Sequence, residues 1–337
     1  IQGVARGLIA LGVETGASTV ILADNGPGWF AAHFGTIAAG AIPTGLYTNN
    51  TAEQCRFIAD HCEAVVAFAG GSRDLEKLLD IRDRLPRLRA IVFMEGEPPD
   101  PHILSWPDLY AAGSATPDDL YRERVEALDP YGVCELIYTS GTTGAPKAVM
   151  LTHRNIAWVA EQVVPILQLR PGDALISYLP LSHIAEQVIS LYGPIFTGAC
   201  TWFAESLDKL GDNLREVRPR IFFAVPRVWE KIQTAMESAG RGSSGFKRRL
   251  VRWARRQGLA GGYAERTGRS KPLFYGLADR LVFSKVRERL GLDHCRDVFT
   301  AAAPISRSTL EFFLGLGIPI LEIYGMSENT GPATLST

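Results

Sequence analysis

Short apolar runs alternate with segments of helical spacing through the first third of the chain. Strands are predicted at residues 19–22, 64–68 and 90–93, and helices at residues 29–40, 52–61 and 74–85. Thr51 is a suitable N-cap for the second of these helices, and Pro86 ends the third. This alternation of strand and helix is the pattern of a parallel sheet with helices on its faces.

The same alternation returns after residue 130. The expected strands are 134–138, 173–178, 201–203, 220–225, 297–300 and 318–324, and the expected helices are 156–167, 207–217, 226–237, 273–290 and 306–316. Residues 95–130 are rich in Pro, Gly and Asp and are expected to form a surface connection. The predicted fold class is therefore α/β, with mostly parallel sheets flanked by helices in two or more subdomains. Residues 1–130 and 131–337 are its approximate halves.

Composition narrows the class of protein. The 337 residues are 46% hydrophobic and 21% charged, which is ordinary for a globular protein with a large core. A net charge of −1 gives no whole-molecule signature of nucleic-acid binding. The five cysteines form no CxxC pair, so neither a disulfide framework nor a zinc site is indicated, and a cytoplasmic location fits. The chain begins at Ile1 inside a predicted helix, and we interpret it as an internal piece of a longer protein.

The densest candidate chemistry follows the apolar run at residues 134–138. In YTSGTTGAPK, from Tyr138 to Lys147, four hydroxyl side chains and two glycines precede one lysine. Glycine lets backbone N–H groups approach an anion, hydroxyls donate to phosphate oxygens, and Lys147 adds a mobile positive charge. A flexible linker is the alternative, but linkers do not usually follow a buried strand and lead into another apolar run. The glycine and lysine spacing differs from that of a Walker A loop.

This ten-residue segment resembles the phosphate loop of the adenylate-forming superfamily, which includes acyl-CoA synthetases, luciferases and peptide-synthetase adenylation domains. The resemblance assigns to the ATP phosphates Thr139, Ser140, Gly141, Thr142, Thr143, Gly144 and Lys147. It implies that residues 1–337 form most of the AMP-binding N-terminal domain, incomplete at both ends. The ribose-binding aspartate, the hinge and the small C-terminal domain are expected after Thr337.

Two later segments resemble the adenine-binding parts of the same superfamily. TAAAP, at residues 300–304, has small side chains that let a flat ring lie against the backbone, although Ala301 stands where the family usually has glycine. EIYGMSEN, at residues 322–329, contains the end of the predicted strand 318–324, and an ordinary strand end followed by a capped helix is the alternative. By resemblance Tyr324 stacks on adenine, Ser327 contacts the α-phosphate and Glu328 holds Mg²⁺. The AMP-binding set is Ala301, Ala302, Ala303, Pro304, Glu322, Tyr324, Gly325 and Ser327.

Two segments point to the acyl substrate. His183, at the end of YLPLSH, matches the histidine beside the family's carboxylate pocket, and a core histidine is the alternative. Gln187 stands where some fatty acyl members have a gating aromatic, so that gate is not expected here. FFAVPRVWEK, at residues 222–231, resembles a segment typical of long-chain acyl-CoA synthetases. Together with LPLSHI, at residues 179–184, and YGMSE, at residues 324–328, it resembles the bubblegum-type branch. The expected acyl pocket contains His183, Val225, Pro226 and Trp229.

The resemblance implies ATP-dependent activation of a long-chain fatty acid to an acyl-adenylate and then a thioester with coenzyme A. ATP, Mg²⁺ and coenzyme A are the expected cofactors and co-substrates, and Lys147, His183 and Glu328 the expected catalytic residues. The chain alone is expected to be incomplete for catalysis. An aryl-CoA, medium-chain or luciferase-like enzyme, or a nucleotide-binding module without catalysis, remains open.

A basic stretch interrupts the pattern between residues 240 and 271. From Lys247 to Arg256 the cations have no acidic neighbour, and Phe246, Leu250 and Trp253 recur at helical spacing. An amphipathic basic helix is therefore predicted at residues 246–257. It is either a solvated face of the domain or a peripheral contact with an anionic membrane.

Overall fold

The structure is a computed structural model that describes residues 1–139, 144–242 and 244–336. The chain divides into two compact units, Ile1–Gln162 with Tyr178–Tyr192, and Val163–Ser177 with Gly193–Thr337. This division differs from the approximate halves 1–130 and 131–337, because the strands on both sides of the predicted phosphate loop join the sheet of the first unit. Each unit is described by itself.

The first unit is built on a sheet of seven strands in the order β5-β4-β3-β1-β2-β6-β7. All neighbours are parallel except β6 and β7. The strands are β1 Ser18–Leu22, β2 Ile42–Leu46, β3 Val66–Ala69, β4 Ala90–Phe93, β5 Leu104–Ser105, β6 Val133–Thr139 and β7 Lys147–Thr152. The helices wholly in this unit are α1 Gln2–Ala10, α2 Pro27–Ala38, α3 Ala52–His61, α4 Ser72–Ile81, α5 Trp106–Gly113, α6 Asp118–Glu126 and α8 Ile184–Gln187.

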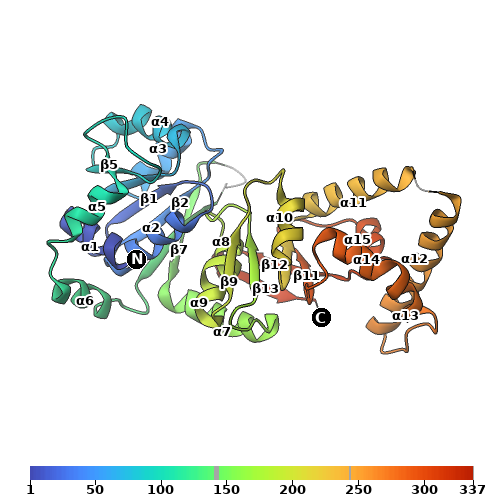
Figure 1. Cartoon of the computed structure of the whole chain (residues 1–337). Coiled ribbons are helices and arrows are strands. Elements are labelled where there is room, and N and C mark those ends of the chain that lie inside the picture. Colours follow the sequence, from blue (N-terminus) through green and yellow to red (C-terminus); the bar gives the residue numbers. More distant parts are fainter. Residues whose placement is uncertain (140–143, 243, 337) are drawn as a thin grey trace. The chain divides into compact units, whose positions relative to one another are not determined.

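Helices cover both faces of this sheet, with α3 and α4 on one side and α1 and α2 on the other (Figure 1). Alternate residues of β1 explain the two layers. Val20 and Leu22 pack in a core cluster that contains residues of α3 and α4, whereas the Thr19 hydroxyl lies 3.0 Å from that of Thr36 on α2. A strand buried on both faces is typical of parallel sheets.

The second unit contains a four-stranded sheet in the order β10-β11-β12-β13 and a parallel pair, β8-β9. Its strands are β8 Ala174–Ser177, β9 Cys200–Phe203, β10 Ile221–Ala224, β11 Asp297–Thr300, β12 Ile320–Met326 and β13 Gly331–Leu335. Its helices are α9 Gly193–Thr197, α10 Leu210–Val217, α11 Pro226–Arg241, α12 Gly245–Arg266, α13 Tyr275–Ala278, α14 Ser284–Leu290 and α15 Arg307–Leu314. The boundary between the units falls within α7, His153–Leu167.

The predicted α/β class is confirmed, and so is most of the element order. The N-cap at Thr51 is also confirmed, because its side chain accepts a hydrogen bond from the Gln54 N–H and the Thr51 N–H donates one to Oε1 of Gln54. The expectation of a surface connection at residues 95–130 is wrong, since β5, α5 and α6 lie there. Ser105 caps α5, and Asp108 completes the capping box, so this polar stretch encodes a helix start.

Candidate functional site

The predicted phosphate loop connects the two antiparallel strands β6 and β7. Thr139, the last residue of β6, is the pairing partner of Lys147, the first residue of β7. The pairing holds the two ends of the loop beside each other, and the Lys147 side chain is exposed, without an ion pair in the described parts of the chain. Ser140, Gly141, Thr142 and Thr143 lie outside the described residues. The part that is described places a free cation at the end of the hairpin.

Tyr138 anchors the strand that leads into this loop. Its side chain is buried, and its hydroxyl lies 2.7 Å from Nδ1 of His61 on α3. Burial raises the pKa of Tyr138 well above its usual range, so the phenol stays neutral and serves as a hydrogen-bonding anchor. The phosphate loop therefore begins from a fixed backbone position.

The predicted carboxylate-binding histidine, His183, is the N-cap of α8. Its Nδ1 accepts a hydrogen bond from the Ala185 N–H at 3.1 Å, which leaves Nε2 to carry the proton in the neutral imidazole. Burial lowers the pKa of His183, so the neutral form is favoured at neutral pH. His183 therefore offers an N–H donor without a positive charge.

Asn25 holds the segment that contains His183, a role that the local sequence around Asn25 does not indicate. Its Nδ2 donates to the Leu179 carbonyl at 2.7 Å, and its Oδ1 accepts from the Leu181 N–H at 3.1 Å. Gln187, at the position of the absent gate, is fully buried and donates to the Leu181 carbonyl at 2.8 Å. Side chains from two separate regions thus fix the backbone next to His183.

A buried polar network lies in the first unit and includes Glu135 of β6. The Tyr192 hydroxyl donates to Oε1 of Glu135 at 3.2 Å and lies 3.0 Å from Nε2 of His33. Because the hydroxyl proton goes to Glu135, Nε2 of His33 is the donor in the second contact. Burial lowers the pKa of His33 to about 3 and raises the pKa of Glu135 to about 8, so both groups are neutral at neutral pH. A carboxyl group within an apolar run was the sequence signal for this network.

In the second unit, parallel pairing collects the predicted adenine-binding segments at one edge of the sheet. Thr300 pairs with Glu322, so residues 301–304 leave β11 beside the point where β12 continues to Tyr324. Glu322 and Tyr324 are both exposed and, two residues apart on a strand, lie on the same face. The sheet therefore brings together the two segments that resemble an adenine site.

Backbone strain occurs within the first of these segments. Ala302 has φ +73°, a left-handed conformation that costs a residue with a Cβ about 1–2 kcal/mol relative to glycine. The family's glycine corresponds to Ala301, but the positive φ falls at the next residue. Ala302, Ala303 and Pro304 are exposed, so this strained turn presents its backbone to solvent.

The second segment turns sharply after Tyr324. A Cβ on Gly325 would lie 2.0 Å from the carbonyl oxygen of Gly331, because β12 and β13 approach closely at an irregular register. Tyr324 is 62% exposed, which leaves its ring available to stack, whereas Ser327 is buried in a 3₁₀ turn, Ser327–Asn329. Only glycine fits at the position between the aromatic residue and the turn.

Glu328 is the predicted Mg²⁺ ligand. Its carboxylate is exposed and has no ion pair or hydrogen bond among the described residues, and these contain no cluster of three or more metal-ligating side chains. Mg²⁺ in nucleotide sites is commonly held by one or two carboxylates and the substrate phosphates. A single free carboxylate fits an ion of that kind.

Two predicted acyl-pocket residues follow β10 at the same sheet edge, since Ala224 pairs with Thr300 and Val225 and Pro226 come next. Trp229 is different. It is fully buried, donates its indole N–H to the Phe299 carbonyl at 3.2 Å and packs edge-on against Phe313. Trp229 thus holds α11 to the sheet, and its part in an acyl pocket stays a prediction.

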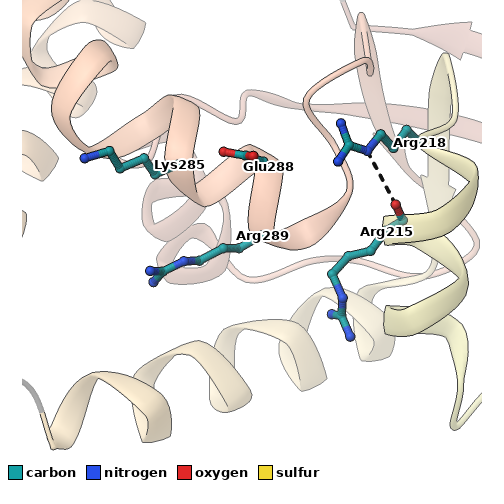
Figure 2. A pocket seen from close by; sticks show the side chains of 5 residues that line it. All are labelled: Arg215, Arg218, Lys285, Glu288 and Arg289. Carbon is teal, nitrogen blue, oxygen red and sulfur yellow. Dashed lines mark hydrogen bonds between the residues drawn. The ribbon is translucent and has the colours of Figure 1, made fainter.

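A surface pocket of about 450 Å³ in the second unit is lined by none of the candidate residues named above (Figure 2). Its walls come from the C-terminal turn of α10 and from α14, which precede β10 and β11. They consist of Arg215, Arg218, Lys285, Glu288 and Arg289. Cations at helix C-termini are favoured by the helix dipole, and Arg218 also donates to the Arg215 carbonyl. Helix C-termini account for Arg215, Arg218 and Arg289 without a ligand, whereas Lys285 lies in the first turn of α14.

Comparison with known proteins gives the family. The model of the family described as AMP-binding enzyme matches residues 1–337, and the chain belongs to that family. Among its relatives, long-chain-fatty-acid–CoA ligase ACSBG2 of Xenopus laevis is 42% identical over 98% of this chain and 46% of its own length. ACSBG2 of Homo sapiens is 38% identical over 98% of this chain and 51% of its own length. The chain thus spans about half the length of these curated relatives.

Solved structures share the fold at low sequence identity. The anthranilate CoA ligase AuaEII in complex with anthranoyl-AMP is 21% identical with a TM-score of 0.70, over 99% of this chain and 55% of its own. The N-terminal domain of FACL13 from Mycobacterium tuberculosis is 19% identical with a TM-score of 0.67, over 99% of this chain and 69% of its own. These matches confirm the predicted N-terminal fold of the adenylate-forming enzymes.

The strained residue Ala302 gives a first prediction. Replacing Ala302 with Gly removes the Cβ clash, and after the entropy that glycine adds to the unfolded chain we expect a gain of about 0.5–1 kcal/mol in unfolding free energy. Ala301→Gly is the matched control, since Ala301 has no positive φ, and it should lower stability. Urea unfolding measures both, and shifts of equal sign would contradict the local strain.

The buried Glu135 gives a second prediction. Between its ordinary pKa of 4.5 and about 8, Glu135 is protonated in the folded chain and ionised in the unfolded chain. Unfolding then releases a proton, so this residue lowers stability as pH rises through that window. Glu135→Gln replaces the protonated carboxyl with a neutral group of the same shape. It should therefore flatten the decline in the urea midpoint between pH 5 and 8.

His33 affects the pH dependence of stability in the opposite direction and serves as the internal control. Its pKa is lowered from 6.5 to about 3, so stability falls as pH decreases below 6.5. That limb should persist in Glu135→Gln. A variant whose stability still declines toward alkaline pH as steeply as the unmodified chain would show that Glu135 is already ionised when folded.

Proposed function

We propose that the protein activates a long-chain fatty acid with ATP and then transfers the acyl group to coenzyme A. In the first step a carboxylate oxygen bonds to the α-phosphorus and pyrophosphate leaves. In the second the thiol sulfur bonds to the acyl carbon, its proton is lost and AMP leaves. The observation that carries the proposal is the β6–β7 hairpin, which pairs Thr139 with Lys147 at the two ends of the loop and leaves Lys147 without an ion pair among the described residues.

The phosphate-binding role is proposed for the loop and its lysine. Hydroxyl and backbone donors in the loop would bind the β- and γ-phosphates, and Lys147 would offset their charge. Proposed in this role are Thr139, Ser140, Gly141, Thr142, Thr143, Gly144 and Lys147. Little covalent chemistry is needed from the protein, because positioning and charge stabilisation lower the barrier.

The AMP-binding role is proposed for the sheet edge of the second unit. Tyr324 would stack on the adenine ring, the backbone of residues 301–304 would lie against it, and Ser327 would contact the α-phosphate. Glu328 would hold Mg²⁺, and this ion when bound offsets charge on the pyrophosphate leaving group. The exposure of Tyr324 and the carboxylate of Glu328, which has no partner in the described parts of the chain, support these roles.

The acid-binding role is proposed for His183. A neutral imidazole with its proton on Nε2 donates a hydrogen bond to a carboxylate without pairing to it as a cation, so it would orient the nucleophile and leave it reactive. Val225 and Pro226 would form part of an apolar wall for the acyl chain. The long-chain assignment comes from the relatives named as long-chain-fatty-acid–CoA ligases. The alternative of an aryl-acid substrate shares the same residues.

Lys147→Ala in the intact protein should lower the rate of adenylation roughly 5- to 150-fold, the effect of about 1–3 kcal/mol for one charged contact. Thermal stability should change little, because the side chain is exposed and unpaired. Lys285→Ala removes another exposed, unpaired lysine and should leave the rate unchanged. Equal rates for Lys147→Ala and the unmodified protein would remove the phosphate loop from the proposal.

The acyl specificity is tested with a series of saturated acids from short to very long, run beside benzoate and coumarate. Each methylene buried in an apolar tunnel contributes up to about 0.8 kcal/mol, so kcat/KM for thioester formation should rise steeply with length until the tunnel ends. A maximum at an aryl acid, or a profile that is flat in chain length, would reject the fatty acyl substrate and leave adenylate formation as the proposal.

A further inference from the structure

Residues 241–281 concentrate positive charge far beyond the rest of the chain. They contain eleven Lys or Arg and two acidic residues, whereas the whole chain has a net charge of −1. Both acidic groups are already paired outside the first half of α12, Glu265 with Lys271 at 3.0 Å and Asp279 with Arg287 at 2.8 Å. The cations at the start of α12 therefore have no acidic partner among the described residues.

The start of α12 is capped by the Ser244 side chain, but its exposed cations lie where the helix dipole disfavours positive charge. Residues 244–249 are all exposed, and Phe246 is 79% exposed. Lys247, Arg248 and Arg249 occupy the first turns, where the helix dipole favours negative charge, and no acidic residue lies in the first turn. Three like charges at the positive end of a helix are stabilised when an anionic surface lies against them.

The other half of α12 is packed and holds the helix in place. Gly258 and Gly262 are buried, and a Cβ on either would meet Gly315 or Leu314 at less than 2.5 Å. Ala254 belongs to a small core with Ala278, Val282 and Phe283. The basic start of α12 thus projects from a fixed base at the edge of the second unit (Figure 1).

The second feature is the apolar outer face of α13, the helix that packs on α12. Phe274, Leu277 and Leu281 recur at spacings of three and four along α13 and the π-helical turn that follows it, Asp279–Phe283. Their exposed fractions are 53%, 47% and 38%. Leu273, which precedes them, is 90% exposed. An outer helix face normally carries polar side chains, and an apolar one indicates contact with a partner.

We infer that α12 and α13 form a docking surface for an anionic phospholipid bilayer. The cations of α12 would bind phosphate and carboxylate groups of the lipid heads, and Phe246, Leu273, Phe274 and Leu277 would enter the acyl boundary. Leu273, Leu277 and Leu281 are aliphatic and do not stack on bases as aromatic rings do, so charge together with aliphatic exposure favours a membrane over a nucleic acid. None of the described helices is long and apolar enough to cross a bilayer, and the inferred contact is peripheral.

This inference goes beyond the proposed function, which it complements because long-chain acids partition into bilayers. Its test measures membrane binding and not enzymatic turnover. A negative result for membrane binding therefore leaves the proposed function untouched, and the reverse also holds. The intact protein is sedimented with vesicles of phosphatidylcholine, with and without phosphatidylserine, at low and high salt. Binding should require phosphatidylserine and weaken with salt, since exposed charges are screened.

Two exposed variants separate the two parts of the surface. Lys247→Gln, Arg248→Gln and Arg249→Gln together should weaken vesicle binding on the order of a hundredfold, at about fivefold for each cation. Leu273→Ser with Leu277→Ser should weaken it roughly tenfold even at low salt. All five side chains are exposed, and circular dichroism checks that the fold is retained.

A third variant controls for charge alone. Arg215→Gln, Lys285→Gln and Arg289→Gln remove three cations from the pocket in Figure 2 and should leave binding within about twofold of the unmodified protein. Equal loss in both triple variants, or equal binding to vesicles without phosphatidylserine, would overturn the inference. Tighter binding to RNA than to vesicles, unaffected by the serine substitutions, would overturn it as well.

Discussion

Strand pairing is the constraint on which the candidate site depends. In the second unit, parallel pairing of β10, β11 and β12 sets Ala224, Thr300 and Glu322 side by side, so the residues that leave β10 and β11 lie next to the end of β12 although the three segments are far apart in the sequence. In the first unit, antiparallel pairing of β6 with β7 returns Lys147 to Thr139. Backbone hydrogen bonds therefore position the candidate residues, so the fold does not depend on which side chains these positions carry.

Around these edges, several local features oppose stability and are held by their surroundings. Ala302 adopts a left-handed conformation without being glycine, and Gly325 allows a backbone approach that no side chain would permit. Glu135 is buried and is kept neutral by its environment, with a hydrogen bond from Tyr192. Strained or desolvated groups of this kind persist where surrounding packing fixes them, and they concentrate at functional sites.

The sequence predicted the α/β class, most elements and both edges of the candidate site, because apolar periodicity and capping residues are local signals. β2 was not predicted, since Pro43 interrupts its apolar run although the strand lies inside the sheet. β13 was not predicted either, because Gly331 and Pro332 read as a turn. The network of His33, Glu135 and Tyr192 joins residues more than fifty positions apart, and linear order gives no access to such contacts. Trp229 was predicted to line the acyl pocket because its segment resembles the family. In the structure its contacts are those of a core side chain.

The central claim is that these residues serve ATP-dependent acyl adenylation, and ATP–pyrophosphate exchange in the intact protein tests it most directly. Exchange reports the first step alone, so it does not require coenzyme A. The account predicts that labelled pyrophosphate enters ATP only when a long-chain acid and Mg²⁺ are both present, and that Glu328→Gln shifts the Mg²⁺ titration to higher concentration. Binding of ATP without exchange for any acid would contradict it and indicate a nucleotide-binding module without catalysis.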